Sequence, residues 1–323
     1  MLKHKKFWGI IFSLVFLWLA LRKVDFQAVP EHLKNVSPLF LGLMLISYTL
    51  EHITRCFRWT SILSHREFPF KYSYFGLVLG FFINNLLPAR AGEFFRAYYL
   101  SEKKVTDYGE AFASIVLERF FDGIMLMTMI LLSLQRFSSH ELLQKASTAA
   151  TTFYAVVLAG LVLLNIKREL FLKIANWFLS FLPAKIESFL SKLLNTFING
   201  LAIVKSPITM LKTLIISILC WTASITTLWL CLQAFGFQES FLTASFILTV
   251  LSISSMVPAS PAGVGVYEFF CIFLMRDVLS YTGEQGAAFC FVMHGFQYFY
   301  VLVAGLIVMA IEGLSMEKLR VKS

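Results

Sequence analysis

The feature that most constrains this chain is a succession of long apolar stretches. Nine of them follow one another, at about 7–21, 38–63, 73–87, 109–134, 148–166, 211–235, 241–257, 262–275 and 286–311. A helix needs roughly 20 apolar residues to cross the hydrocarbon core of a bilayer. Four stretches exceed that length, 148–166 is just adequate, and 7–21 becomes long enough with its flanks. We therefore expect an all-α, polytopic integral membrane protein with about six spanning helices.

The composition narrows the class of protein further. Hydrophobic residues make up 58% of the 323 residues and charged residues only 15%, whereas a soluble domain carries about 25% charged residues. These values exclude a secreted enzyme, a nucleic-acid-binding module and a disordered tail. The five cysteines lie in or beside apolar stretches without metal-type spacing. We expect no disulfide framework, no metal site, no cofactor and no nucleic-acid partner.

Three of the apolar stretches, 73–87, 241–257 and 262–275, are short and end at Pro or Gly. They are typical of half-helices that enter and leave the membrane on one side, and broken backbone at that depth needs cover from protein or a water-filled cavity. We expect two broken, re-entrant half-helix pairs, with full spanning as the alternative. The predicted turn residues are Pro88, Gly92, Pro258, Pro261, Gly263 and Gly265.

The basic residues predict the orientation. With the N-terminus inside, 19 of the 28 Lys and Arg residues fall on the inner side and 6 on the outer side. Arg55, Arg90 and Arg119 remain at membrane depth. Cytoplasmic loops carry an excess of Lys and Arg, so the net charge of +9 reflects topology. We expect a multi-pass protein of the cell membrane with both termini cytoplasmic, whose first helix has no small-residue cleavage site.

Two segments resemble each other across the chain, one over 75–95 and one over 246–270. Each has a short apolar run, two polar residues, a proline, a glycine and then Glu-Phe-Phe. This weak inverted repeat is the pattern that points to a transporter's central site, with chance similarity of apolar sequence as the alternative. We expect one domain over 1–323, with repeat halves at about 38–134 and 211–312.

The segment between the halves, about 168–205, is too polar for the membrane core but has apolar residues at helical spacing. Two interpretations fit this segment equally. It forms either amphipathic helices on the inner membrane surface or a cytosolic helical hairpin that joins the two halves.

Ionisable residues at membrane depth are costly and usually face a partner or a water-filled path. Glu51, Arg55 and Arg58 share one helix face, and Arg90 follows the break at Pro88, where a new helix would offer its N-terminus to an anion. The candidate substrate-binding residues are Arg55, Asn84, Asn85, Arg90, Glu93, Arg96, Glu118, Arg119, Asp122, Glu268 and His294.

Each candidate also has a structural interpretation. The acids and arginines can form internal ion pairs between helices. Asn84 and Asn85 can satisfy backbone groups freed at the break, and His294 can be a packed, hydrogen-bonded residue instead of a ligand or proton relay.

Four segments carry a resemblance to a known family: 55–63 (RCFRWTSIL), 85–96 (NLLPARAGEFFR), 118–122 (ERFFD) and 258–268. They resemble the lysylphosphatidylglycerol synthase transmembrane-region family, also called flippase-like domain proteins, over roughly 5–315. The resemblance implies a plasma-membrane domain associated with moving lipids between leaflets. Larger members carry a soluble aminoacyl-transferase domain; this sequence ends at Ser323, straight after its last predicted helix, so we expect none and no enzyme activity. His294 stands where the family pattern has Arg.

Three functions follow as hypotheses. The first is translocation of an anionic or aminoacylated phospholipid, or a polyprenyl-linked lipid, with Arg90, Arg96 and Arg119 holding the headgroup phosphate. The second is a membrane enzyme or enzyme subunit acting on lipid-linked substrates, motivated by the acids on the same segments. The third is a non-transporting partner, for example of a lipid-synthesising enzyme, that docks through 168–205. The oligomeric state does not follow from the sequence.

Overall fold

Every element of the computed structural model is helical. It describes residues 13–22, 24–63, 70–87, 90–137, 167–183, 207–255 and 261–314, with scattered helical residues within 145–160 and 187–195. The elements are α2 (Val29–Lys34), α3 (Pro38–Ile62), α4 (Phe70–Leu86), α5 (Ala91–Glu102), α6 (Tyr108–Phe137), α8 (Arg168–Leu179), α10 (Pro207–Ala234), α11 (Phe241–Ser254), η2 (Pro261–Gly263), α12 (Val266–Phe273), η3 (Leu274–Val278) and α13 (Gly283–Glu312). No strand occurs among these residues, so the all-α class is confirmed.

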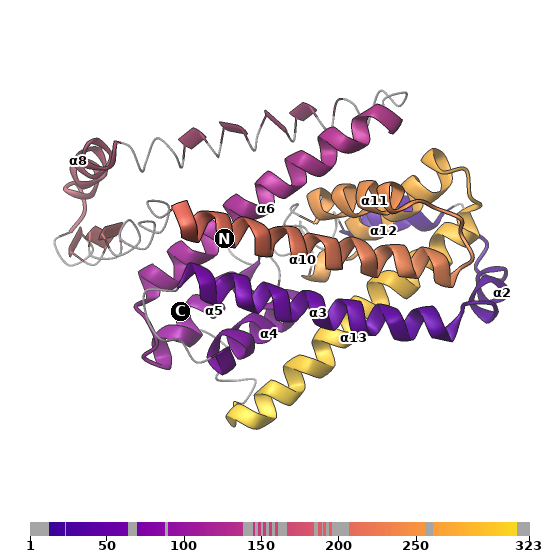
Figure 1. The fold of residues 1–323 in the computed structure, drawn as a ribbon, viewed down its shortest axis with the longest axis horizontal. Helices are drawn as coiled ribbons and strands as arrows, with labels where there is room; N and C mark the ends of the chain where they lie inside the picture. The colour runs from indigo at the N-terminus through magenta and orange to yellow at the C-terminus, as the bar shows by residue number, and fades with distance from the viewer. Residues whose placement is uncertain are drawn as a thin grey trace.

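Four long helices, α3, α6, α10 and α13, fall on the four longest apolar stretches (Figure 1). Within the described residues, α10 and α13 are long and apolar enough to cross a membrane by length and composition. The middles of α3 and α6 carry charged side chains, which lowers their mean hydropathy. The count of about six spanning helices therefore stays a prediction.

Local sequence signals set the helix ends. Proline occupies the first turn of α3, where its missing N–H costs nothing. The hydroxyl of Thr282 accepts from the Gln285 N–H while the Gln285 side chain accepts from the Thr282 N–H, which caps the start of α13. That helix ends at Gly313 in the left-handed conformation, with φ of 61°.

Both expected breaks coincide with helix ends. The first lies between α4 and α5, where Arg90 adopts a left-handed conformation with φ of 53° directly before α5. The second lies between α11 and α12, and there Gly263 and Gly265 have φ of 76° and 94°. Pro261 begins η2 within this second turn. Pro88 and Pro258 lie outside the described residues.

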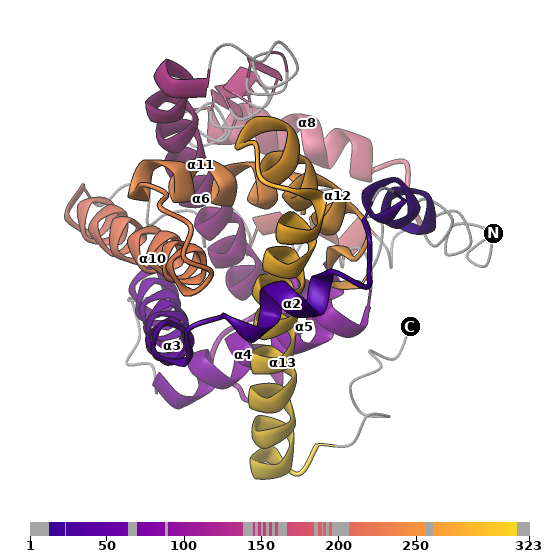
Figure 2. The same cartoon turned by 90° about the vertical axis from the view of Figure 1, so that its right-hand side faces the viewer.

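Helices from the first part of the chain, α3 to α6, interlock with those from the last part, α10 to α13. α3 packs lengthwise along α10, α13 crosses α4, and α11 packs on α6 (Figures 1 and 2). The α3–α10 contact is joined by hydroxyls: Ser47 donates to the Ala223 carbonyl at 3.0 Å and Thr227 to Ser47 at 3.1 Å. Each half thus buries part of its surface against the other.

α8 stands apart from α3 and α10 in Figure 1. Its apolar side chains at 170, 171, 174, 177 and 178 are exposed, at the spacing that predicted an amphipathic helix. The rest of the predicted connector, from 184 to 205, falls largely outside the described residues.

The break between α4 and α5 depends on a close backbone approach. A Cβ built on Gly92 would overlap the carbonyl oxygen of Gly80 on α4. The Gly92 N–H donates to Oδ1 of Asn84 at 2.8 Å, so the same contact satisfies a backbone donor freed by the break. The two half-helices therefore pack at a distance that only glycine allows.

Gly92→Ala is expected to destabilise the protein by about 1–3 kcal/mol, because the clash is with backbone that cannot rotate away. Gly42→Ala is the matched control, since a Cβ on Gly42 has nothing within 4 Å. Thermal unfolding in detergent should show a lower midpoint for the first variant only. Equal midpoints would contradict the close approach.

Candidate functional site

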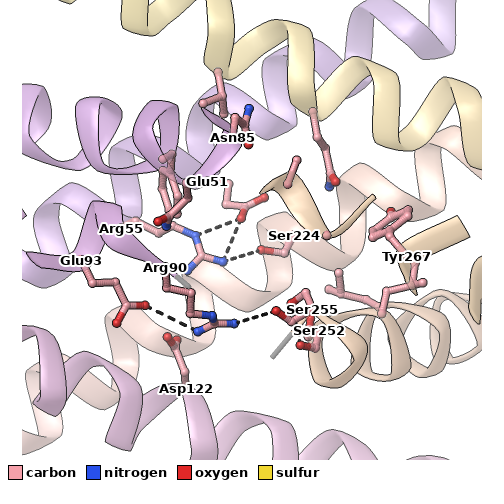
Figure 3. A pocket seen from close by; sticks show the side chains of 18 of the residues that line it. Glu51, Arg55, Asn85, Arg90, Glu93, Asp122, Ser224, Ser252, Ser255 and Tyr267 are labelled. Atoms are coloured by element: carbon pink, nitrogen blue, oxygen red, sulfur yellow. Dashed lines mark hydrogen bonds and ion pairs between the residues drawn. The ribbon is translucent and has the colours of Figure 1, made fainter. Parts of the chain in front are cut away.

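A cavity of about 600 Å³ lies between the two broken half-helix pairs. Side chains from α3, α4, α5, α6, α10, α11, α12 and α13 line it, and Figure 3 shows the arginines of the first half facing the serines and tyrosine of the second. Eight of the eleven sequence-predicted site residues reach it: Arg55, Asn84, Asn85, Arg90, Glu93, Arg119, Asp122 and His294.

The other three predicted residues, Arg96, Glu118 and Glu268, do not line the cavity. Arg96 lies behind its wall, with Nη2 at 2.6 Å from Oε2 of Glu118 and its guanidinium 3.9 Å from the ring centroid of Trp59. Both charged side chains are at most 4% exposed. The structure thus places Arg96 behind the cavity wall, paired with a buried carboxylate, and the prediction that it holds a headgroup stays a prediction.

Arg58 is the centre of this buried network. Its Nη1 lies 2.7 Å from Oδ1 of Asp122 and its Nη2 3.5 Å from Oε1 of Glu118. Its side chain is 1% exposed, and burying such a charge requires paired and hydrogen-bonded partners. The network joins α3, α5 and α6 and reaches the cavity lining through Asp122.

Arg90 and Arg119 have the guanidinium groups most open to the cavity, with side chains 34% exposed. Arg119 lies 3.2 Å from Glu93 and 2.9 Å from Asp122. Arg90 contacts the same Glu93 at 3.5 Å and donates to the Ser255 carbonyl at 3.4 Å (Figure 3). Two cations therefore share one carboxylate at the cavity surface.

Arg55 is more enclosed, with a side chain 14% exposed. It pairs with Glu51 at 2.9 Å, as their i, i+4 spacing predicts, and donates to the Ser224 hydroxyl at 3.4 Å. Asn85 donates to the Tyr298 carbonyl at 3.4 Å. These contacts tie α3 to α10 and α4 to α13 around the cavity.

The second half contributes a histidine–carboxylate pair. Nδ1 of His294 lies 2.6 Å from Oε1 of Glu268, and Nε2 of His294 lies 3.1 Å from the Ala262 carbonyl oxygen. The other carboxylate oxygen of Glu268 accepts the Gly265 N–H at 2.5 Å. Tyr267 stacks on the imidazole at 4.1 Å between ring centroids. Glu268 thus acts on the turn before α12 and not directly on the cavity.

Sequence reasoning missed several cavity residues because they are uncharged. They include Tyr48, His52, Trp221, Ser252 and Tyr267. Nδ1 of His52 bonds to the Tyr48 carbonyl at 2.9 Å, and Trp221 donates to Asp122 at 3.1 Å. Aromatic and hydroxyl residues are common on every helix of this chain, so no signal in the sequence marks these as lining a cavity.

Residues 6–305 match the family described as Lysylphosphatidylglycerol synthase TM region. The chain belongs to this family. The family match and its relatives establish a membrane protein and agree with the resemblance drawn from the sequence.

Two relatives of this chain come from Methanocaldococcus jannaschii. The UPF0104 membrane protein MJ1595 is 22% identical over 80% of this chain and 81% of its own length. The UPF0104 membrane protein MJ1078 is 24% identical over 70% of this chain and 92% of its own length. Glycosyltransferase AglD of Haloferax volcanii is 22% identical over 92% of this chain but only 53% of its own length.

The charged side chains that line the cavity balance, with Arg55, Arg90 and Arg119 matched by Glu51, Glu93 and Asp122. Behind the wall, Arg58 and Arg96 share Glu118, and Arg58 also contacts Asp122. The arginines at the cavity surface are therefore paired, and a ligand would meet them in that state. Among the described residues no group of three or more His, Cys, Asp or Glu side chains is placed to hold a metal ion.

Arg58→Ala is expected to destabilise the protein by about 3–5 kcal/mol, because Asp122 and Glu118 each lose one of their two arginine partners and a large buried side chain is removed. Arg276→Ala is the control: this arginine is 32% exposed and pairs with the neighbouring Asp277, so its loss should cost less than about 1 kcal/mol. Chemical unfolding in detergent measures both. A small effect at Arg58 would contradict its role as the centre of the network.

Proposed function

We propose that this chain moves an anionic lipid between the leaflets of the cell membrane. The observation that carries the proposal is the cavity between the two broken half-helix pairs, with Arg90 and Arg119 one-third exposed inside it. Broken helices that face each other at the interface of inverted repeats are the usual setting of a transport site. About six spanning helices, two re-entrant pairs and cytoplasmic termini complete the proposed topology.

The headgroup phosphate would bind between Arg90 and Arg119. Arginine presents a planar set of donors that matches phosphate oxygens, and these two guanidinium groups share only Glu93 at the cavity surface. A phosphate bound here would accept hydrogen bonds from both arginines. Phospholipids, aminoacylated phospholipids and polyprenyl-linked lipids all carry this group, so the recognised chemistry is the phosphate.

In this proposal the chain performs no catalytic step. The acids that motivated an enzyme are occupied: Glu118 holds Arg58 and Arg96, Asp122 holds Arg58 and Arg119, and Glu268 holds the turn at Gly265. A general base needs a carboxylate within reach of the reacting proton. These contacts support a role for Glu118, Asp122 and Glu268 in holding the arginines and the turn in place.

Arg90→Ala is expected to slow lipid exchange between leaflets by at least about tenfold, because a hydrogen bond to a charged group contributes roughly 1.5–3 kcal/mol. The measurement is loss of fluorescence to an external quencher in liposomes that contain labelled phosphatidylglycerol. Arg276→Ala, outside the cavity lining, should exchange lipid at the wild-type rate. Equal rates for Arg90→Ala and wild type would overturn the proposal for the lipids tried.

A second candidate is a membrane partner of an enzyme that builds lipid-linked sugars. The observation that favours it is the likeness to glycosyltransferase AglD, which covers 92% of this chain and about half of that protein. The exposed apolar face of α8 would then be the docking surface. Lipid analysis of a deletion strain separates the candidates: loss of a lipid species favours synthesis, while unchanged totals with altered sidedness favour transport.

A further inference from the structure

The hydrogen bonds of His294 specify where its protons lie. Nε2 contacts the Ala262 carbonyl oxygen at 3.1 Å, and a carbonyl oxygen only accepts, so Nε2 carries a hydrogen. Nδ1 lies 2.6 Å from Oε1 of Glu268, a distance typical of a charge-assisted hydrogen bond. That bond needs one more proton, either on Nδ1 or on the carboxylate.

The pair cannot keep this geometry without that proton. If Nδ1 and Oε1 are both deprotonated, two lone pairs face each other at hydrogen-bond distance and repel. The side chains of His294 and Glu268 are 12% and 8% exposed, so little water is available to screen them. One proton is therefore a structural component of the pair, and His294 connects the pair to the cavity that it lines.

The same two side chains hold the turn of the second half-helix pair. His294 bonds to the carbonyl of Ala262, and Glu268 accepts the N–H of Gly265. Ala262 has φ of 54°, a conformation that a residue with a Cβ rarely adopts. Ala262 and Gly263 also form part of the cavity wall. The proton thus links α13 to a wall segment that is held in an unfavourable backbone conformation.

The charge of the Glu268–His294 pair depends on this one proton, because the titratable groups next to the pair are a phenol and thiols. The titratable groups near it are Tyr267 and Cys271 on α12, Cys290 on α13 and Cys231 on α10, which are a phenol and thiols. α4 and α11 contribute amides and hydroxyls to the cavity wall. The charged side chains that line the same cavity come from α3, α5 and α6 and are Glu51, Arg55, Arg90, Glu93, Arg119 and Asp122.

We propose that Glu268 and His294 form a proton-binding site that controls the turn at 261–265, so that proton loss releases this wall of the cavity from α13. This part of the inference rests on the proposed function: the proton is then the ion whose binding is coupled to lipid movement. The first half of the cavity presents arginines, which stay charged at all physiological pH values, and His52, whose Nδ1 bonds to the Tyr48 carbonyl of its own helix. The proton-binding site proposed here belongs to the second half.

Amide hydrogen exchange of the full-length chain in lipid nanodiscs tests the site itself. Between pH 5 and 9, corrected for intrinsic exchange, protection of the peptide containing 261–265 should fall by about tenfold or more. Glu268→Gln should keep the turn protected throughout, because the amide accepts from Gly265 and donates to Nδ1 without a titrating proton. His294→Ala should leave the turn unprotected throughout. Glu31→Gln, on an exposed pair with Lys34, should behave like wild type.

Translocation of labelled phosphatidylglycerol by the same variants separates this inference from the proposed function. A wild-type rate that depends on pH and a Glu268→Gln rate that does not would support both. Lipid movement with pH-independent protection of the turn would overturn the proton site and leave the translocation proposal standing. Protection that follows pH without lipid movement at any pH would support the proton site and overturn the proposed function.

Discussion

The cost of burying charge in an apolar helix bundle is the constraint on which this structure depends. Arg58, 1% exposed, sits between Asp122 and Glu118, and Glu118 also pairs with Arg96. Breaking such a buried pair is strongly destabilising because a charge is left without a partner. The network therefore fixes the relative depth of α3, α5 and α6. The position of the cavity next to it follows from that alignment.

Exposure divides the arginines into two sets with different roles. Arg58 and Arg96 are enclosed by their carboxylates and Trp59 and hold helices together. Arg90 and Arg119 lie a third exposed around a single shared Glu93. Arginines that are already paired with carboxylates can stabilise a transient anion without holding it permanently, since part of the attraction is already used internally. A site that must release its ligand needs this balance.

The sequence indicated where the helix breaks and the buried charges lie, but not which side chains pair with one another. Pro and Gly placed both helix breaks within a few residues, and the rarity of charge at membrane depth led to Arg55, Arg90 and Arg119. It did not distinguish Arg96, which lies behind the cavity, from Arg90, which lies in it, because the carboxylate that covers Arg96 is 22 residues away on the next helix. Arg58 was placed on the right face, yet its partner Asp122 is 64 residues away. His52 and Tyr267 were missed because only tertiary packing brings neutral side chains to a cavity.

The lengthwise contact between α3 and α10 has a consequence for how the chain is made. Ser47 and Arg55 on α3 find acceptors at Ala223 and Ser224, which are synthesised about 170 residues later. In the proposed topology α3 would enter the bilayer before these partners exist, and insertion of a helix with unsatisfied polar groups is costly. The first half would then complete its packing only after α10 has been synthesised, so that a helix made early would settle late.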